Sequence, residues 1–521
     1  MSKAAEDLRK MIDVNIPIIC IEDFDFVRMD EIIMEALPHV KIHEWNHATG
    51  NTNFKTREEY GSGKAQSLED FLYEFYLQEG VPESPFEAIV VLKGLADSLN
   101  EERVCRLLAL MAQRKLYDRS YEVTVILEAD SISLPQELKH YATFLEIEFP
   151  SEEDIEEIIY EHVIANDATF EEGSMQDLKF SLKGMSRFEI DRTLDMALSK
   201  NGTLGKDDMN MILGQKEQMV KKSGLLELIK TASMDMDSIG GMDALKEYIQ
   251  RKSYIIKNAS KAIKCGVSIP KGIFLVGMPG CGKSLSAKVA AKVFEVPLLK
   301  MDMGSLMDKY VGESEKKLRR AIVTAEAAAP CILWIDEIEK GFSGIGGKDG
   351  QQSDVMTRMF GYFLGWMQDK TSTVYVIATA NNAENLPPEL KRKGRFDEVF
   401  CVNLPNKEER KKIFEVHLKK KKQEKVLSDS VVASLASKTE GFNGADIGSV
   451  INEAMEEQFY AQKDNPSSTE IRLTKETLEK VISNTVSISK SCKKQIDEMK
   501  TVFNNSSFKD ATTGKLTNNG K

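Results

Sequence analysis

The chain consists of two long blocks in which short apolar runs alternate with longer stretches of helical periodicity, and the blocks meet near residue 215. The apolar runs are rich in β-branched residues and have the length of buried strands. Strands that alternate with helices predict parallel sheets covered by helices on both faces. The predicted strands are residues 18–21, 88–92 and 123–127 in the first block and residues 272–276, 331–335 and 374–377 in the second.

Two segments lie outside this alternation. Residues 215–230 are charged and contain Gly224, a pattern that predicts a helical linker between the blocks. Residues 504–507 and 512–521 are polar with few apolar side chains, which predicts disorder at the end of the tail. The apolar runs all fall short of the roughly 18 residues that a membrane helix needs, so no membrane span is expected.

Composition is that of a soluble protein with more than one core. Of 521 residues, 42% are hydrophobic and 29% are charged, and at about 150 residues per domain this length predicts three to four folded units. Seven cysteines lie far apart without a CxxC pair, which argues against disulfides or zinc and for a reducing compartment. The start, MSKAAED, has no signal-peptide core, so a cytoplasmic location is expected. The net charge of −12 gives no support for nucleic acid as a partner.

A glycine-rich segment at residues 277–284, GMPGCGKS, follows a predicted strand and leads into a helical run. This is the P-loop pattern, in which backbone N–H groups point at phosphates near the positive end of a helix. Lys283 is expected to bind the β- and γ-phosphates, and the Ser284 hydroxyl to bind Mg²⁺. The predicted nucleotide contacts in this segment are Gly277, Pro279, Gly280, Cys281, Gly282, Lys283, Ser284 and Leu285. Cys281 is expected to pack rather than to react.

Two further predicted strands end in polar residues that suit hydrolysis. The run at residues 332–335 ends in Asp336, which can hold Mg²⁺ through water, and Glu337, which can polarise an attacking water. The run at residues 374–380 ends in Asn381, which can orient that water or the γ-phosphate. Solvated acids and a turn residue are the alternatives, and the P-loop about fifty residues upstream favours the catalytic interpretation.

Residues 386–397, LPPELKRKGRFD, carry two arginines three positions apart, Arg392 and Arg395. Such arginines can reach the γ-phosphate of a neighbouring subunit, where they stabilise the charge of the transition state and raise the rate by about 10³–10⁵. The alternative is that both are solvated surface residues.

With these motifs, residues 235–490 resemble the AAA clade of P-loop ATPases. Residues 441–447, GFNGADI, resemble the family's lid motif, which implies a nucleotide contact at Ala445. Residues 238–241, SIGG, resemble the segment that covers the adenine and would place Ile239 against the base. His417 falls where the family often has a nucleotide-contacting histidine, although a helix-surface histidine is the alternative. The resemblance implies binding and hydrolysis of ATP with Mg²⁺, in a ring of about six subunits.

Four shorter segments resemble a narrower group, the "hypothetical chloroplast frame" AAA proteins of plastids, cyanobacteria and other bacteria. In that group an N-terminal domain without a P-loop precedes one AAA module, and a plastid-encoded member would work in the stroma. The matching segments are residues 223–227, 271–272, 329–338 and 378–382.

Residues 309–314, KYVGES, resemble the loop with which AAA rings grip a polypeptide in the central pore, and imply that Tyr310 and Val311 contact it. The narrower group often lacks an aromatic residue there, and a surface tyrosine is the alternative. Residues 341–347 are expected to form a second loop that faces the pore.

The first block repeats the pattern of the second in the same order, as a duplicated domain would. Residues 22–25, EDFD, stand in place of the glycine loop, and Lys93 and Gly94 stand in place of Asp336 and Glu337. The first block is therefore expected to lack an ATP site and to serve as a scaffold or recognition platform. The matching segments are residues 88–92 with 331–335, 123–130 with 374–381, 134–138 with 386–390 and 184–197 with 441–454.

The expected fold is α/β, with a P-loop AAA module and a helical lid preceded by a degenerate AAA-like α/β domain. The expected function is Mg²⁺-dependent ATP hydrolysis coupled to remodelling of a protein or complex, which binds through the N-terminal half. The alternatives are a nucleotide-gated scaffold and, disfavoured by the charge, a nucleic-acid-associated ATPase. The expected divisions are 1–150 for the degenerate domain, 151–230 for a helical lid-like region and linker, 231–402 for the AAA core, 403–490 for the lid and 491–521 for the tail.

Overall fold

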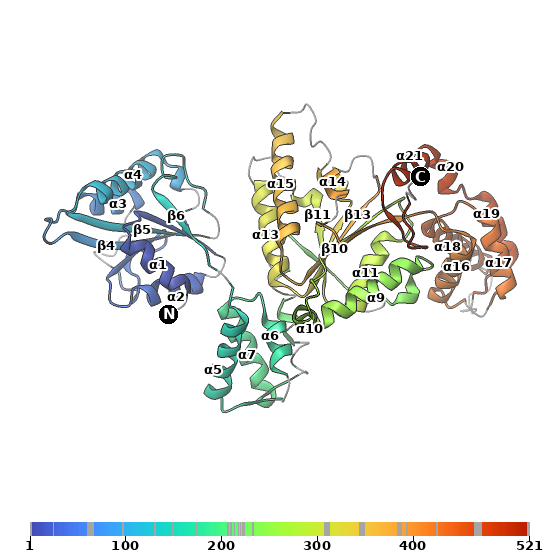
Figure 1. Cartoon of the computed structure of the whole chain (residues 1–521), viewed down its shortest axis with the longest axis horizontal. Coiled ribbons are helices and arrows are strands. Elements are labelled where there is room, and N and C mark those ends of the chain that lie inside the picture. The colour runs from blue at the N-terminus through green and yellow to red at the C-terminus, as the bar shows by residue number, and fades with distance from the viewer. Residues whose placement is uncertain are drawn as a thin grey trace. The chain divides into compact units, whose positions relative to one another are not determined.

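The structure is a computed structural model, and the chain separates in it into two compact units, Met1–Met175 with Met185–Leu204 and Gln176–Gly184 with Gly205–Lys521. Each unit contains a sheet with helices on both faces (Figure 1). The described residues are 3–23, 26–59, 67–95, 98–129, 132–147, 149–171, 174–205, 208, 211–212, 214–216, 218, 220, 224–231, 234–306, 313–342, 350–382, 388–391, 394–423, 426–462 and 471–517.

The first unit is built on a six-stranded sheet. Its strands are β1 (Ile18–Glu22), β2 (Ile42–Asn46), β3 (Gly50–Asn53), β4 (Phe86–Lys93), β5 (Tyr121–Ala129) and β6 (Ala142–Leu145). The sheet order is β3-β2-β4-β5-β1-β6, and all neighbours pair in parallel except β3, which runs antiparallel to β2.

Helices cover both faces of this sheet, which is why its central strands are continuous apolar runs in the sequence. Helices α1 (Lys3–Asp13) and α2 (Phe26–Ala36) share one core with Ile19 and Ile21 of β1. Helices α3 (Leu68–Leu77) and α4 (Glu102–Tyr117) share the opposite core with Ile18 and Cys20. Two more helices, α5 (Glu152–Ala165) and α7 (Arg187–Asn201), begin at serine capping boxes, and β7 (Thr169–Phe170) pairs with β8 (Thr203–Leu204).

The second unit contains a seven-stranded sheet in the order β15-β14-β10-β13-β12-β11-β9. Its core strands pair in parallel, and β9 runs antiparallel to β11. The core strands lie side by side in the order β14-β10-β13-β12-β11, which is 5-1-4-3-2 when they are numbered along the chain. The first unit has the same order, β6-β1-β5-β4-β2, when β3 is left out. The prediction of an AAA-type α/β fold preceded by a related α/β domain is confirmed. The strands are β9 (Glu227–Ile229), β10 (Gly272–Gly277), β11 (Leu298–Asp302), β12 (Cys331–Asp336), β13 (Val374–Ala380), β14 (Glu398–Val402) and β15 (Lys509–Asp510).

Helices α9 (Asp243–Lys257) and α11 (Lys283–Phe294) pack on one face of the second sheet. Helices α13 (Glu313–Ala327), α15 (Gly350–Asp369) and α21 (Lys493–Asn504) pack on the other. A separate helical group has its own small core (Figure 1), and consists of α16 (Lys407–Lys420), α17 (Asp429–Lys438), α18 (Gly444–Ala461) and α19 (Lys475–Asn484). The shorter helices are α6 (Met175–Leu182), α10 (Ala259–Lys264), α12 (Met303–Leu306), α14 (Ile338–Phe342) and α20 (Ile488–Ser491).

The structure corrects two expectations. The described residues 215, 216, 218 and 220 of the linker are helical as predicted, but residues 227–229 form β9, because Leu228 and Ile229 pair with β11 at the edge of the sheet. Residues 504–507 and 512–517, within the segments expected to be disordered, are ordered, and the N–H of Thr517 donates to the carbonyl oxygen of Phe508. The tail around them forms α21 and β15. Its few apolar side chains recur at helical spacing, at Ile496, Met499 and Phe503, and all three are buried in the core. Among the described residues, no helix is long and apolar enough to cross a membrane.

Candidate nucleotide site

A cavity of about 470 Å³ lies at the carboxyl ends of three adjacent strands of the second sheet, β10, β13 and β12. Because these strands are parallel and adjacent, the loops that follow them meet at one edge of the sheet. The volume lies in the ordinary range for small-molecule sites. Thirteen of the residues predicted to act there line the cavity: Ile239, Pro279, Gly280, Cys281, Gly282, Lys283, Ser284, Leu285, Asp336, Glu337, Asn381, His417 and Ala445. Gly277 ends β10 beneath it.

The glycine-rich loop needs glycine at two positions. Gly280 and Gly282 have φ angles of 74° and 94°, in the left-handed region that favours glycine. A Cβ atom at Gly280 would lie 2.4 Å from Nδ2 of Asn443, so the loop also approaches the N-terminus of α18 closely. Helix α11 begins at Lys283, and the first amides of a helix lack intrahelical acceptors. The loop and helix together therefore suit an anion such as a phosphate.

Lys283 is a buried cation beside the acidic residues of the site. Its Nζ donates to the carbonyl oxygens of Gly277 at 2.7 Å and Met278 at 2.8 Å. Burial lowers the pKa of Lys283 to about 8. Burial also raises the pKa of the Cys281 thiol to about 11, which keeps it protonated and fits its predicted packing role.

The acids and Asn381 form one hydrogen-bonded group. Thr379 Oγ1 donates to Asp336 Oδ1 at 2.7 Å, and Asn381 Nδ2 donates to Glu337 Oε1 at 2.8 Å. The backbone N–H of Asn381 donates to Glu339 Oε1, also at 2.8 Å. Glu337 itself has a left-handed φ of 51°. Asn381 thus contacts the predicted general base directly, and Glu339, which the sequence analysis missed, fixes the backbone of Asn381.

The donor set fits Mg²⁺ bound to a nucleotide. Ser284 and Asp336 offer oxygen atoms to the same cavity, and Mg²⁺ prefers oxygen ligands. Lys283 and the N-terminus of α11 supply positive potential where phosphates would carry negative charge.

Ile239 and His417 also line the cavity; Ile239 is almost completely buried, and His417 packs against helix α18. A Cβ atom at Gly448 of α18 would lie 2.8 Å from Cε1 of His417, so glycine is required at this contact. Burial lowers the pKa of His417, which keeps its imidazole neutral near pH 7. His417 is therefore held against α18 rather than exposed on a helix surface.

The predicted subunit-contact residues are only partly described. Arg395 is half-buried, and its Nη1 donates to the carbonyl oxygen of Glu389 at 2.7 Å. Arg392, the pore residues Tyr310 and Val311, and most of the loop at residues 341–347 lie outside the described residues.

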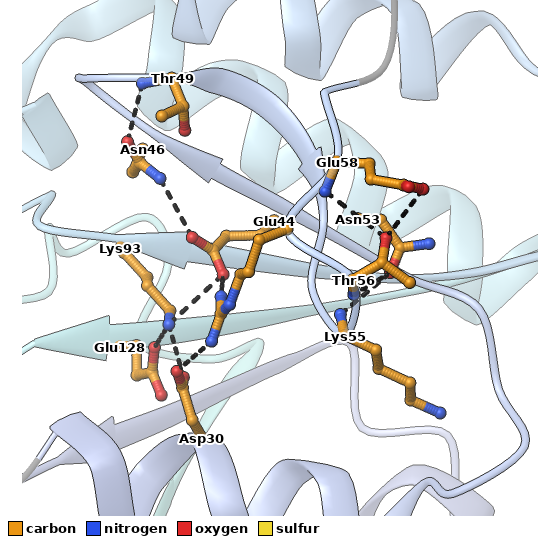
Figure 2. A network of polar contacts seen from close by, with 11 residues as sticks. Asp30, Glu44, Asn46, Thr49, Asn53, Lys55, Thr56, Glu58, Lys93 and Glu128 are labelled. Carbon is orange, nitrogen blue, oxygen red and sulfur yellow. Dashed lines mark hydrogen bonds and ion pairs between the residues drawn. The ribbon is translucent and has the colours of Figure 1, made fainter.

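The corresponding edge of the first sheet holds a network of charges (Figure 2). Lys93, at the end of β4, lies 2.5 Å from Asp30 of α2 and 3.4 Å from the carboxylates of Glu44 and Glu128. Arg57 also pairs with Asp30 and Glu44. Burial, together with the nearby acids Asp30 and Glu44, raises the pKa of Glu128 to about 8. Asp30, Glu44 and Glu128 thus place three carboxyl groups at this edge of the sheet, and the absence of an ATP site in the first block stays a prediction.

Replacing Lys93 by methionine is expected to lower the free energy of unfolding of the first unit by about 1–3 kcal/mol, since Asp30, Glu44 and Glu128 would lose the cation that they share and their buried polar atoms would lose a donor. Denaturant unfolding of the full chain measures this. Lys10→Met, at an exposed lysine of α1, is the control and should change the value by less than about 0.5 kcal/mol. Adding Glu128→Gln to Lys93→Met should recover part of the loss; unchanged unfolding of the single variant would contradict the proposed role of Lys93.

Comparisons with known proteins agree with the fold. The model of the ATPase family associated with various cellular activities (AAA) matches residues 273–404. The models of the N-terminal domain and the second domain of SpoVK-like AAA ATPases match residues 4–147 and 153–223. The second unit is thus a AAA ATPase module, preceded by domains that accompany such modules in other proteins.

Several relatives match most of the chain, among them one from Guillardia theta and one from Trieres chinensis. Both are named "Uncharacterized AAA domain-containing protein ycf46". The protein from Guillardia theta is 32% identical over 89% of each chain, and that from Trieres chinensis is 32% identical over 89% of this chain and 90% of the relative. The chain belongs to the ycf46 family of AAA proteins, as predicted. The ATP-dependent zinc metalloprotease FtsH of Cyanidium caldarium is 34% identical over 42% of this chain and 35% of its own length.

Proposed function

We propose that this protein hydrolyses ATP with Mg²⁺ and uses the energy to remodel a protein or protein complex. The observation that carries the proposal is the convergence of Lys283, Asp336, Glu337 and Asn381 on one cavity. They come from three places, the start of α11, the end of β12 and the end of β13, and each residue supplies a function that phosphoryl transfer needs.

The residues divide the chemistry among them. Lys283 and the amides of the glycine loop bind and position the phosphates. Ser284 and Asp336 would hold Mg²⁺, which when bound neutralises negative charge on the phosphates. Glu337 accepts the proton of the attacking water. Asn381 Nδ2 donates to Glu337 Oε1 and Lys340 Nζ pairs with Oε2, so both carboxylate oxygens of Glu337 are held in place. Ile239 and His417 contact the base of the nucleotide. Ala445 contacts the nucleotide from the lid and so couples nucleotide binding to the position of the lid.

We further propose that six subunits form a ring, in keeping with AAA proteins, and that Arg392 and Arg395 act on the neighbouring site. Residues 403–490 serve as the lid, and Tyr310 and Val311 contact the substrate. The first unit serves as the docking platform for a partner protein, since its own sheet edge is filled by the Lys93 network. A nucleotide-gated scaffold that assembles a complex without threading it is the second candidate.

The ATPase rate of the full chain distinguishes these functions. With Mg²⁺ and ATP, turnover is expected to rise when an unfolded protein is added and to stay constant when DNA is added. Lys283→Ala serves as the control for contaminating ATPases and should remove turnover under every condition. A rate that no protein changes would favour the scaffold, and stimulation by DNA would overturn the proposal.

A further inference from the structure

A short segment near the C-terminus, residues 509–514, lies beside the nucleotide cavity, and we call it the C-terminal strap. Its first part, β15, pairs in parallel with β14 through Lys509 and Asp510. The N–H of Ala511 then donates to the carbonyl oxygen of Cys401 at 3.0 Å, and Ala511 is buried. The AAA family model ends at residue 404, so the strap lies outside the part of the chain that it matches.

The strap binds the start of helix α9. The N–H of Leu245 donates to the carbonyl oxygen of Ala511 at 2.9 Å, and the N–H of Ala244 donates to that of Thr512 at 3.3 Å. Both amides belong to the first turn of α9, where a helix offers them no intrahelical acceptor. Residues 239–242, which line the base side of the cavity, lead directly into this turn. The strap therefore fixes the position at which that segment enters the helix.

Glu409 of α16 joins the strap to the same segment. Its Oε1 accepts a hydrogen bond from Thr512 Oγ1 at 2.6 Å and another from the N–H of Met242 at 3.1 Å. Its Oε2 accepts from the N–H of Asn406, which caps α16. Gly241 has a φ of 94°, and a Cβ atom there would lie 2.6 Å from Oε1 of Glu409. One buried carboxylate thus connects the strap, the base-side segment and the first helix of the lid.

The strap has an internal turn that holds Thr512 in place. Asp510 Oδ1 accepts hydrogen bonds from the N–H groups of Thr512 at 3.0 Å and Thr513 at 2.7 Å. Asp510 Oδ2 accepts from Nδ2 of Asn403 at 2.8 Å, which ties the turn to the loop after β14. Ala511, Thr512, Asn403 and Glu409 all line the cavity. The side chains that fix the strap are therefore those that form one wall of the site.

We propose that the C-terminal strap is a wall of the nucleotide site and that Thr512 is a positioning residue for the adenine side of ATP, acting through Glu409. This inference rests on the proposed binding of ATP. The hydroxyl of Thr512 holds Glu409 in the orientation that receives the N–H of Met242, and so keeps residues 239–242 in the arrangement that binds the base. The apparent affinity for ATP is proportional to the fraction of molecules in that arrangement, so it falls when that fraction falls.

Thr512→Val tests the proposal, because valine keeps the shape of threonine and removes the hydroxyl. Binding of a fluorescent ATP analogue to the full chain is expected to weaken about three- to tenfold, with the melting temperature of the nucleotide-free protein unchanged. Thr513→Val is the matched control, since Thr513 is exposed and donates only within the strap in the described contacts. Thr512→Ser keeps the hydroxyl and should bind like wild type.

The outcomes separate the two proposals. If wild type binds the analogue, Lys283→Ala does not, and Thr512→Val binds within twofold of wild type, the role of Thr512 is wrong while the ATP site stands. If Thr512→Ser binds as weakly as Thr512→Val, the methyl group rather than the hydroxyl matters and the route through Glu409 is wrong. If wild type itself does not bind the analogue, the proposed function fails and the role of Thr512 fails with it.

Discussion

Replacing Glu337 by glutamine is expected to leave ATP bound and to slow its hydrolysis by about 10²–10⁴-fold, the usual contribution of a general base. Glutamine keeps the shape of the side chain and its hydrogen bond from Asn381, which donates Nδ2 to Oε1 at 2.8 Å. It cannot accept the proton of the attacking water. Single-turnover hydrolysis and equilibrium binding of a fluorescent ATP analogue, measured on the same preparation, separate the loss of chemistry from any loss of binding.

Glu408→Gln is the matched control, because Glu408 is an exposed acid in the first turn of α16. It should hydrolyse ATP at the wild-type rate. Wild-type turnover in Glu337→Gln would remove Glu337 from the role of base. Because the variant is expected to remain in its ATP-bound state, it is also suited to retaining a bound partner, which mass spectrometry of the purified complex can then identify.

Replacing Arg395 by alanine is expected to reduce turnover about 10³-fold or more, if the arginine acts on the neighbouring subunit as an arginine finger. In the described chain its guanidinium reaches only the carbonyl oxygen of Glu389, so loss of the side chain should leave nucleotide binding within its own subunit intact. Mixing Arg395→Ala subunits with Lys283→Ala subunits should restore activity, since an intact pocket can then face an intact arginine.

The mixing experiment needs two controls. Arg251→Ala, at an exposed arginine of α9 that lies over the Tyr248 ring, should keep wild-type turnover. Each inactive variant alone should stay inactive at the total protein concentration of the mixture. Loss of activity in Arg395→Ala without recovery on mixing would place the arginine in its own site and argue against action between subunits.

Sequence motifs predicted the parts of the site whose residues lie close together along the chain. Residues 277–284 form one continuous loop, and Asp336, Glu337 and Asn381 each follow an apolar strand, so composition and spacing were sufficient. The strand order that brings them together followed from the resemblance to AAA proteins rather than from periodicity. The contact between Asn381 and Glu337 depends on the side-chain geometry of two adjacent strand ends, which a linear pattern does not specify.

The contacts that were missed join residues distant in the chain. Thr512 and Glu409 meet although 103 positions separate them, and neither belongs to a recognisable motif. Residues 504–507 and 512–521 of the tail were expected to be disordered because their composition is polar. A small number of apolar residues at helical spacing, Ile496, Met499 and Phe503, is nevertheless sufficient to anchor it in a core that the rest of the unit provides. Glu339 was missed because one acid near two catalytic acids is not distinctive in sequence.

The pairing of β15 with β14 also bears on solubility. Strand β14 consists of Glu398, Val399, Phe400, Cys401 and Val402, a sequence with high β-propensity. Without β15 it would be the outermost strand on that side of the sheet, with unpaired backbone groups able to recruit a strand from another molecule. The two residues of β15 and the turn that follows shield part of this edge. The polar tail therefore protects the AAA module against edge-to-edge aggregation, and a fragment that stops after the lid helices would lose that protection.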